Sequence, residues 1–365
     1  MKKLLLLVVL VGVFCISCSG KRSKADVVDD TCRVAEVAKI PAKIPNNQIW
    51  YTNYDTTTPT EPNVTSAFGA NILSNTYDTK KECWVIQFDR NVTTIGTLAF
   101  SGCSSLTTIT IPDSVTTIGA QAFLNCSNLE SVNIPERVTA IEYDAFAGCG
   151  DLISVTIPDS VTSIGVAAFR DCKNLTRATI GNGVTKVGME VFSGCGSLIS
   201  VTIPDSVTTI GDSAFYHCRS LTSVTIPDSV TTIGEMAFRG CIGLTSIVIP
   251  DHVTTIGRGA FWDCSSLISV TIGNRVATIE NSAFSECDSI TSITIPESVA
   301  FIGYHAFDGD NLKRVYCKAV IPPTAESVMF GVNTDVFVPT GSVDAYVSAS
   351  GGWSLYRYSI NGYDF

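Results

Sequence analysis

The sequence predicts a repeat solenoid, made mainly of β strands, turns and short irregular or helical return segments, with about ten coils of 23 residues and a cap at each end. Three observations predict this fold. Phenylalanine recurs every 23 residues, at Phe100, Phe123, Phe146, Phe169, Phe192, Phe215, Phe238, Phe261, Phe284 and Phe307. The string SVTIPDSVTTIG stands at residues 200–211 and again at 223–234. Apolar and hydroxyl-bearing residues alternate before each phenylalanine, which is the period of a half-buried strand. Stacked coils need the same residues at the same place, whereas the segments of a globular core differ.

Each coil is expected to contain a short strand, a turn and a return segment. In the first full repeat the strand lies around Leu106 to Ile111, with alternate residues facing inward. Pro112 ends strand pairing because proline has no N–H to donate, and the Asp and Ser after it favour a turn. Gly181 and Gly273 replace this proline in two coils. One coil cannot bury its own apolar side chains, so neighbouring coils must cover one another.

Both ends of a solenoid need a cap, because they would otherwise expose unpaired strand edges and apolar faces. We assign residues 83–317 to the solenoid, residues 48–82 to an N-terminal β cap and residues 318–365 to a C-terminal cap. The N-terminal cap is rich in aromatic residues and threonine and lacks the repeat. At the start of the solenoid, Cys83 and Phe88 are expected to keep the strand register of the repeat.

The C-terminal end of the repeat is marked by a change of phase. After Phe307 the repeat shifts by one residue. The apolar columns are then occupied by Leu312, Val315 and Cys317. The cap is expected to hold a last strand and a short helix from Ser342, with Trp353 and Tyr356 packed over the open end.

Residues 1–17 predict an export signal, and residues 18–47 a tether between membrane and solenoid. Lys2 and Lys3 precede an apolar run that extends to Ile16, which is the layout of a secretory signal. The tether carries alternating charges and two prolines. We therefore expect the chain to be exported.

The end of the signal resembles a bacterial lipoprotein box, in which a small residue precedes the lipidated cysteine. Cys18 is the expected lipidation site because Ser17 before it is small, while Phe14 before Cys15 is bulky. Such boxes usually carry leucine where this chain has Cys15, so ordinary signal cleavage is the alternative. Lipidation would anchor the chain in the outer membrane.

The tandem pattern LxxIxIPxxVxxIGxxAFxxC resembles the BspA-like, or Treponema pallidum-type, class of bacterial leucine-rich repeats. The flanking strings IWYTN and FGANILSNTY upstream, and YCKAVIPPT and VFVPTGSVDAY downstream, resemble the caps of lipoproteins of this kind in Bacteroides-like anaerobes. The resemblance covers nearly all of the mature chain. It implies a surface adhesin that binds extracellular-matrix or plasma proteins, and it brings no catalytic residues.

Nine of the fourteen cysteines occupy one repeat position. They are Cys103, Cys126, Cys149, Cys172, Cys195, Cys218, Cys241, Cys264 and Cys287. Leucine-rich repeats carry at this place a ladder of Asn or Cys side chains that satisfy backbone groups of the turn. An odd number of parallel side chains favours free thiols over disulfides, although neighbouring coils would bring them close enough to bridge. The sequence has no Cys-x-x-Cys pair with histidine partners, so it does not indicate a metal site.

Composition and motifs favour a binding protein over an enzyme. A formal net charge of −10 argues against a nucleic-acid partner, since phosphate backbones bind Lys and Arg surfaces. The histidines His217, His252 and His305 occupy three different repeat columns, so they form no catalytic or ligand set. No glycine-rich phosphate loop or HExxH segment is present. We predict no catalytic activity and no cofactor.

Two polar columns are candidate ligand sites with simpler structural explanations. One column carries acids or asparagine, at Asp113, Glu136, Asp159, Asn182, Asp205, Asp228, Asp251, Asn274 and Glu297. Stacked carboxylates bind calcium in some proteins, but Asp after Pro is also a favoured turn residue. The second column is a hydroxyl ribbon on the strand face, formed by Thr108, Ser131, Ser154, Ser200, Ser223, Ser246, Ser269 and Ser292. It suits a glycan or another ordered surface, but the β-propensity of these residues explains it without a ligand.

The candidate partner-binding residues follow the repeated phenylalanines. Successive coils place Tyr216, Arg239 and Trp262 there, and Arg170 lies two coils before the tyrosine. Stacking would set a guanidinium between two aromatic faces. Trp, Tyr and Arg dominate interface hot spots, although such a stack would also stabilise neighbouring coils without a partner.

Two functions fit these observations. The first is a lipid-anchored cell-surface protein that binds host extracellular-matrix or plasma proteins, or other bacterial surface macromolecules. The alternative is a glycan-capture accessory lipoprotein of a nutrient-uptake system.

Overall fold

The computed structural model describes residues 43–54, 56–309, 311–327, 329–331 and 333–365. Contacts divide the chain into Met1–Glu36 and Val37–Phe365, and every described residue belongs to the second unit. The predicted export signal, Cys18 and most of the tether lie outside the described residues.

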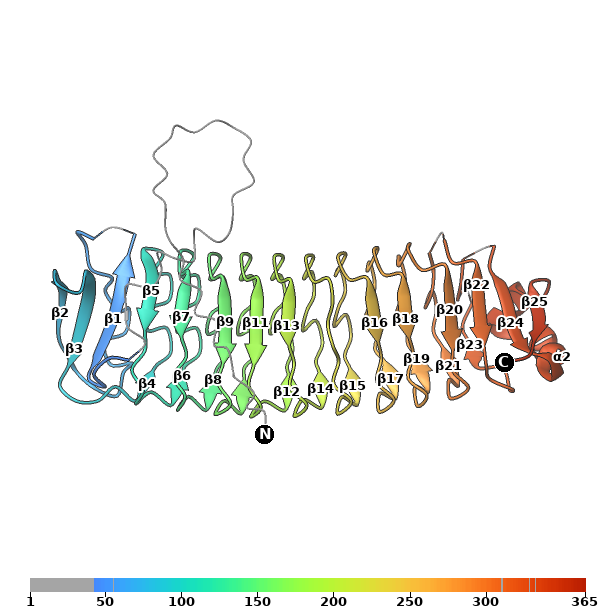
Figure 1. Ribbon diagram of the computed structural model, residues 1–365, viewed down its shortest axis with the longest axis horizontal. Helices are drawn as coiled ribbons and strands as arrows, with labels where there is room; N and C mark the ends of the chain where they lie inside the picture. The colour runs from blue at the N-terminus through green and yellow to red at the C-terminus, as the bar shows by residue number, and fades with distance from the viewer. Residues whose placement is uncertain (1–42, 55, 310, 328, 332) are drawn as a thin grey trace, which may run out of the picture. The chain divides into compact units, whose positions relative to one another are not determined.

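The described unit is a β-solenoid, which confirms the predicted fold class. Most coils contribute one strand to a first ladder and a two-residue strand to a second, and Figure 1 shows both ladders in chain order. The coil that carries Ser223 has no strand in the first ladder. The first ladder comprises β5 (Leu106–Thr110), β7 (Ser131–Asn133), β9 (Ser154–Ile157), β11 (Arg177–Ile180), β13 (Ser200–Thr202), β16 (Ser246–Val248), β18 (Ser269–Thr271), β20 (Ser292–Ile295), β22 (Arg314–Cys317), β24 (Asp335–Pro339) and β25 (Ile360–Tyr363). The second comprises β4 (Thr94–Ile95), β6 (Thr117–Ile118), β8 (Ala140–Ile141), β10 (Ser163–Ile164), β12 (Lys186–Val187), β14 (Thr209–Ile210), β15 (Thr232–Ile233), β17 (Thr255–Ile256), β19 (Thr278–Ile279), β21 (Phe301–Ile302) and β23 (Thr324–Ala325).

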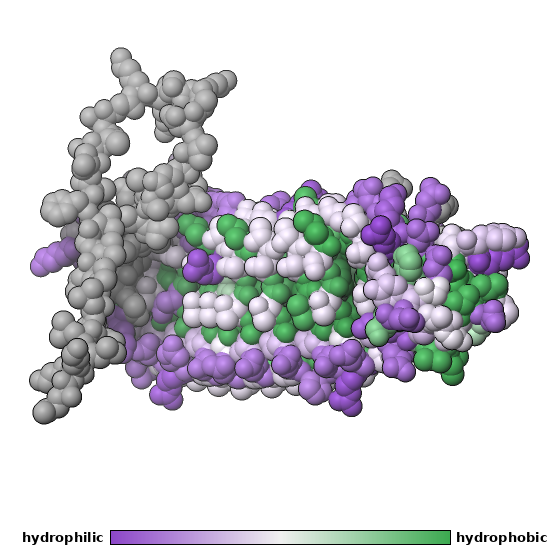
Figure 2. Space-filling model, turned by 45° about the vertical axis from the view of Figure 1, so that its right-hand side comes forward, coloured by the Kyte–Doolittle hydropathy of each residue, from purple (hydrophilic) through white to green (hydrophobic). Residues whose placement is uncertain are grey.

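The ladders are parallel and bring equivalent repeat positions together. Arg177 on β11 pairs with Ser154 on one side and with Ser200 on the other, each 23 residues away in sequence. Each repeat position therefore forms a column along the stack. Figure 2 shows these columns as lengthwise bands of similar hydropathy on the surface.

The core consists of apolar columns, of which the phenylalanine column is the largest. Phe100 to Phe307 are all buried, and their rings stack with neighbouring centroids 5.0 to 5.7 Å apart. The rings are close to parallel, as in the 4° between Phe123 and Phe146. At these distances the parallel rings are offset, the arrangement that aromatic pairs prefer over a face-to-face sandwich. Each coil therefore covers the apolar side chains of its neighbours.

The return segment has two residues with a left-handed backbone in most coils, one on each side of the buried Ala-Phe pair. In the second coil they are Gln121 with φ 56° and Asn125 with φ 57°. At the second of these positions glycine alternates with longer residues. A Cβ on Gly148 would lie 2.3 Å from the Asn125 Oδ1, and one on Gly194 would lie 2.4 Å from the Asp171 Oδ1. The longer side chain of one coil thus occupies the space that the next coil leaves open.

The cysteine column forms the predicted polar ladder. The Sγ of Cys126 donates to the carbonyl oxygen of Phe100 at 3.0 Å, and the same bond, from 3.0 to 3.3 Å, recurs up to Cys287. Burial raises the pKa of the ladder thiols from Cys126 to Cys264, that of Cys241 to about 12. The cysteines that the structure describes are all free. Each ladder thiol has a backbone acceptor in the preceding coil.

The N-terminal cap differs from the prediction at one strand. β1 (Gln48–Asn53), β2 (Ile72–Asp78) and β3 (Cys83–Phe88) form a sheet in the order β2-β3-β1-β5. β3 was expected to keep the register of the repeat, but it pairs antiparallel with β1 and β2. β1 itself pairs antiparallel with β5, so it occupies the edge that a parallel coil strand would have used. The regular coil begins instead at Val92, which is buried, and continues in β4.

β1 also changes the exposure of the first coil. Thr110 stands at an outward position of the predicted alternation, but it lies opposite Trp50 and is buried. Thr52 joins the hydroxyls of Thr107 and Thr108 through its Oγ1, at 2.7 and 2.6 Å. The outward hydroxyl ribbon therefore begins after β5.

The C-terminal cap follows one further coil. Val315 and Cys317 are buried on β22 as predicted, and the ladder continues through β24 and β25. Phe330 extends the phenylalanine column, with its ring centroid 5.8 Å from that of Phe307. The stack therefore runs beyond the predicted boundary at residue 318.

The predicted end packing is confirmed. The short elements η1 (Thr340–Ser342), α2 (Val343–Ser348) and η2 (Gly351–Leu355) follow β24. Trp353 and Tyr356 both pack on Phe330, with ring centroids 6.1 and 5.2 Å away. The Trp353 Nε1 donates to the carbonyl of Pro323 at 2.7 Å, so the indole is held by a polar contact as well. In the described part of the chain no helix has both the length and the apolar character to cross a membrane.

Candidate binding surfaces

The predicted aromatic-cation stack is present on the return side of three successive coils. We call Tyr216, Arg239 and Trp262 the Arg239 stack. The Arg239 Cζ lies 3.7 Å from the ring centroid of Trp262 and 5.8 Å from that of Tyr216. The predicted geometry, a guanidinium between two aromatic rings, is therefore confirmed. All three side chains are half-buried, so part of each faces solvent.

The contacts of Arg239 are with two aromatic rings and a thioether. Within the described residues, no carboxylate forms an ion pair with Arg239, and its Nη1 contacts the Met236 Sδ at 3.8 Å. The Tyr216 ring lies against His217 in an edge arrangement, with centroids 4.1 Å apart. Burial, together with Arg219 and Arg239, lowers the pKa of His217. The arrangement presents a fixed cation with aromatic surface on both sides.

Arg170 does not belong to the Arg239 stack. Ser193 occupies the same repeat position in the coil between Arg170 and Tyr216. The Arg170 Nη2 lies 3.4 Å from the Asp144 Oδ1, and its Nη1 lies 3.2 Å from the Glu190 Oε2. The side chain is thus fixed between carboxylates of the two adjacent coils, which sequence reasoning did not anticipate.

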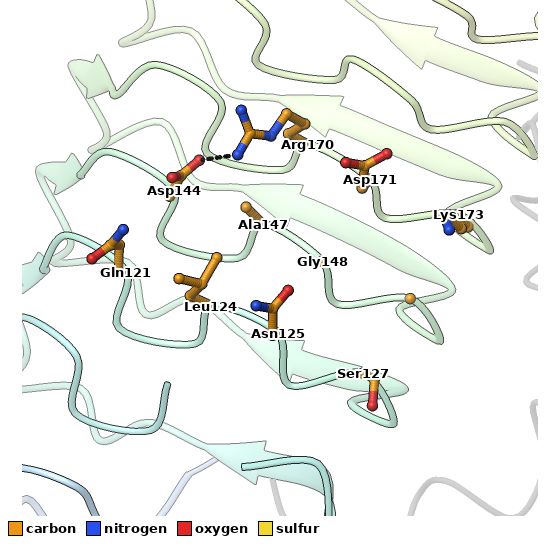
Figure 3. A pocket seen from close by; sticks show the side chains of 11 residues that line it. Gln121, Leu124, Asn125, Ser127, Asp144, Ala147, Gly148, Arg170, Asp171 and Lys173 are labelled. Carbon is orange, nitrogen blue, oxygen red and sulfur yellow. Dashed lines mark ion pairs between the residues drawn. The ribbon is translucent and has the colours of Figure 1, made fainter. Parts of the chain in front are cut away.

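A hollow that the repeat pattern did not reveal lies beside Arg170. We call it the trough, with a floor of Ala147, Gly148 and Gly150 and a volume of about 630 Å³. One wall is formed by Leu124, Asn125 and Ser127, the other by Arg170, Asp171 and Lys173, and one end by Gln121 and Asp144. Figure 3 shows the three coils side by side, with Asn125 directed toward Gly148 and Asp144 paired to Arg170. The available signal was a coil with small residues between two coils with long ones.

The acid column has contacts that assign it a structural role in two coils. The Asp159 Oδ1 accepts a hydrogen bond from the backbone N–H of Asn182 at 2.7 Å, and the Asp251 Oδ1 accepts one from Asn274 at 2.7 Å. These bonds connect the turns of adjacent coils. Over the residues with described positions, no group of three or more His, Cys, Asp or Glu is arranged to hold a metal ion.

The hydroxyl ribbon is exposed along much of the first ladder. Ser154 and Thr156 on β9 face outward, as do Ser269 and Thr271 on β18. Parallel register aligns each with its equivalents in adjacent coils. The ribbon is regular, but its exposure alone does not indicate a ligand.

Comparison with known proteins identifies the repeat. The family model for the BspA type leucine rich repeat region matches residues 70–199 and 185–313, with six copies. No curated protein matches the chain.

Solved structures of bacterial leucine-rich repeat proteins are similar to the chain. A leucine-rich repeat protein from Bacteroides ovatus is 26% identical, with 81% of this chain and 92% of that chain covered and a TM-score of 0.44. A leucine rich cell surface protein from Faecalibacterium prausnitzii is 26% identical, with 75% and 87% covered and a TM-score of 0.40. A leucine rich repeat protein from T. pallidum is 26% identical, with 55% and 73% covered and a TM-score of 0.32.

The matched residues extend over more than half of the chain and coincide with the stacked coils. The coil length, the parallel ladders and the phenylalanine and cysteine columns all follow from the repeat pattern that the family model matches. The chain belongs to the family of proteins with BspA-type leucine-rich repeats.

Proposed function

We propose that the protein is a lipid-anchored cell-surface protein whose solenoid binds other proteins. Its partners are extracellular-matrix or plasma proteins of a host, or other bacterial surface macromolecules. Export rests on the signal in residues 1–17, and outer-membrane anchoring rests on Cys18. The role is one of binding rather than catalysis.

The Arg239 stack is the observation that carries this proposal. A guanidinium 3.7 Å from the Trp262 ring centroid is held in place before any partner arrives, which lowers the entropy lost on binding. Arg, Trp and Tyr are the residue types that contribute most to protein interfaces. A cation without a carboxylate partner among the described residues favours acidic or carbonyl-rich surfaces.

Solid-phase binding tests the proposal. The full chain is applied to immobilised fibronectin and fibrinogen, and saturable binding is expected to at least one of them. The double variant Tyr216→Ala, Trp262→Ala is expected to lose at least tenfold in affinity. Tyr304→Ala removes another exposed aromatic ring on the return side and serves as the matched control, with unchanged affinity expected. Retained affinity in a folded double variant would show that the Arg239 stack is not the binding site.

A further inference from the structure

The strand β25 ends the first ladder with an open edge. It pairs in parallel with β24 on one side, and Figure 1 shows it at the C-terminal end of the ladder. Among the described residues no strand pairs with its other side, although η1 and α2 contact it. The edge of a sheet presents unpaired backbone N–H and C=O groups, which can pair with a strand of another chain.

The register of β25 shows which of its backbone groups face the open side. The Val336 N–H of β24 donates to the Ser359 carbonyl at 2.9 Å, and Val336 is aligned with Ile360. In a parallel pair, alternate residues of a strand direct their N–H and C=O groups toward the neighbouring strand. Asn361 therefore directs its backbone groups toward β24, whereas Ile360 and Gly362 direct theirs away from it. The open edge offers donors and acceptors placed symmetrically on either side of Asn361.

β25 lacks the features that usually keep an edge strand from pairing, which are charged side chains, proline and bulges. At the opposite end of the solenoid, β2 has an irregular register with β3, and Lys80 and Lys81 follow it. The sequence of β25 is INGY, with no charge and no proline, and its register with β24 is continuous. Of these two edges, β25 is the one suited to accept another strand.

Exposed aromatic side chains flank this edge in the sequence and in β25 itself. Tyr358, Tyr363 and Phe365 are 90%, 43% and 51% exposed. The Tyr363 and Phe365 rings pack edge to face, with their centroids 5.0 Å apart. Aromatic residues are enriched at protein interfaces, and a strand docked on β25 would remove part of this apolar surface from water.

The charges beside β25 favour a second copy of the same strand in antiparallel orientation. The exposed Arg357 precedes β25 and the exposed Asp364 follows it, and neither forms an ion pair within the described part of the chain. Antiparallel alignment brings the Asp364 end of one copy to the Arg357 end of the other, whereas parallel alignment would bring like charges together. The backbone also suits a two-fold axis at Asn361, because the outward groups of Ile360 in one copy then meet those of Gly362 in the other.

We propose that two copies of the protein associate end to end through antiparallel pairing of their β25 strands, with Asn361 of one copy opposite Asn361 of the other. The first ladders of the two copies then continue as one sheet. The interface uses no residue of the Arg239 stack, so its formation does not depend on the proposed function. If that function holds, the dimer presents two binding surfaces, which raises the apparent affinity for a partner with repeated sites.

The test is the mass of the full chain in solution, measured by sedimentation equilibrium over a range of concentrations, and a monomer–dimer equilibrium is expected. Asn361→Lys and Asn361→Asp each set like charges opposite one another at the two-fold axis, so each is expected to weaken dimerisation by about fivefold or more. Asn361 is exposed, so neither change disturbs the core. An equal mixture of the two variants is expected to dimerise again, because lysine then faces aspartate.

Thr271→Lys is the matched control, since Thr271 is exposed on the outward face of β18 in the same ladder, and unchanged dimerisation is expected. A monomer at every concentration would overturn the proposal. Dimerisation of Asn361→Lys as strong as that of the unchanged chain would show that the dimer forms elsewhere. A mixture of the Asn361→Lys and Asn361→Asp variants that remains monomeric would rule out the antiparallel register.

Discussion

The imidazole of His217 lies over the backbone of Gly240 in the next coil. A Cβ on Gly240 would come within 2.2 Å of the His217 Nδ1, and Gly240 itself has φ 72°. The identity of one residue is therefore set by the size of its neighbour one coil earlier. This relationship recurs between Asn125 and Gly148 and between Asp171 and Gly194, and it explains why glycine alternates with longer residues along the column.

The first prediction concerns Gly240→Ala, which is expected to destabilise the protein in two ways. The left-handed backbone alone costs an alanine about 1–2 kcal/mol, and the contact with His217 adds to this. Gly102→Ala is the matched control because Gly102 also has φ 72° but has no atom within 4 Å of the added Cβ. Urea unfolding is expected to show a greater loss in the free energy of unfolding for Gly240→Ala than for Gly102→Ala. Adding His217→Ala to the Gly240→Ala variant is expected to remove this difference. Equal losses for both glycine variants would contradict the proposed contact.

The second prediction concerns the thiol ladder. Cys218→Ala removes a hydrogen bond to the Phe192 carbonyl and a buried sulfur, and it is expected to lower the free energy of unfolding by about 1–3 kcal/mol. Cys103→Ala should cost less than about 1 kcal/mol, because Cys103 is only half-buried and its Sγ lies 3.9 Å from the Glu61 carbonyl. Denaturant midpoints at pH 7 compare the two. A ladder variant no less stable than the control would show that the thiol bonds contribute nothing.

The third prediction is a loss of stability at alkaline pH. Burial raises the pKa of Cys241 from 9.0 to about 12, and that of Cys218 well above 9.0. The folded state therefore keeps its thiol protons while the unfolded state loses them above pH 9. The contribution of the protonated thiols to the free energy of unfolding is fully present below pH 9, and it falls as the pH rises from 9 toward 12. Unfolding midpoints measured between pH 7 and 11 are expected to fall above pH 9, less steeply in Cys218→Ala, and a pH-independent difference between the two proteins would refute the linkage.

The same burial predicts how the thiols react. At pH 8.5 the ladder cysteines are expected to resist iodoacetamide in the folded protein and to react after unfolding in urea, because the thiolate is the reactive species. Mass spectrometry of the alkylated chain counts the modified residues. Labelling of Cys241 in the folded protein at the rate seen in urea would contradict its burial.

The columns could be predicted from sequence because residues 23 positions apart become neighbours in a solenoid. This reasoning gave the phenylalanine core, the thiol ladder and the position of Arg239 between Tyr216 and Trp262. It did not give contacts between different columns. Asp144 and Glu190 stand in one column and Arg170 in another, so both ion pairs join different columns.

The cap and the trough depend on properties that the repeat does not encode. The strand Cys83–Phe88 has apolar residues at the positions of a coil strand, but its antiparallel pairing with β1 and β2 cannot be read from the repeat. The trough requires comparison of side-chain size across three coils, since Ala147 and Gly148 form a floor only because Leu124 and Arg170 are longer.

The last prediction concerns Cys18, on which the proposed anchoring depends. If Cys18 is the lipidated residue, Cys18→Ala is expected to abolish incorporation of labelled palmitate and to release the chain from the membrane fraction, because a single cysteine carries the acyl chains. Cys15→Ala is the matched control, and it should leave both unchanged since bulky Phe14 precedes Cys15. Protease treatment of intact cells then tests display. A surface-exposed chain is cleaved in intact cells, whereas a chain that survives there and is cleaved only after lysis would lie inside the outer membrane and could not act as a surface binding protein.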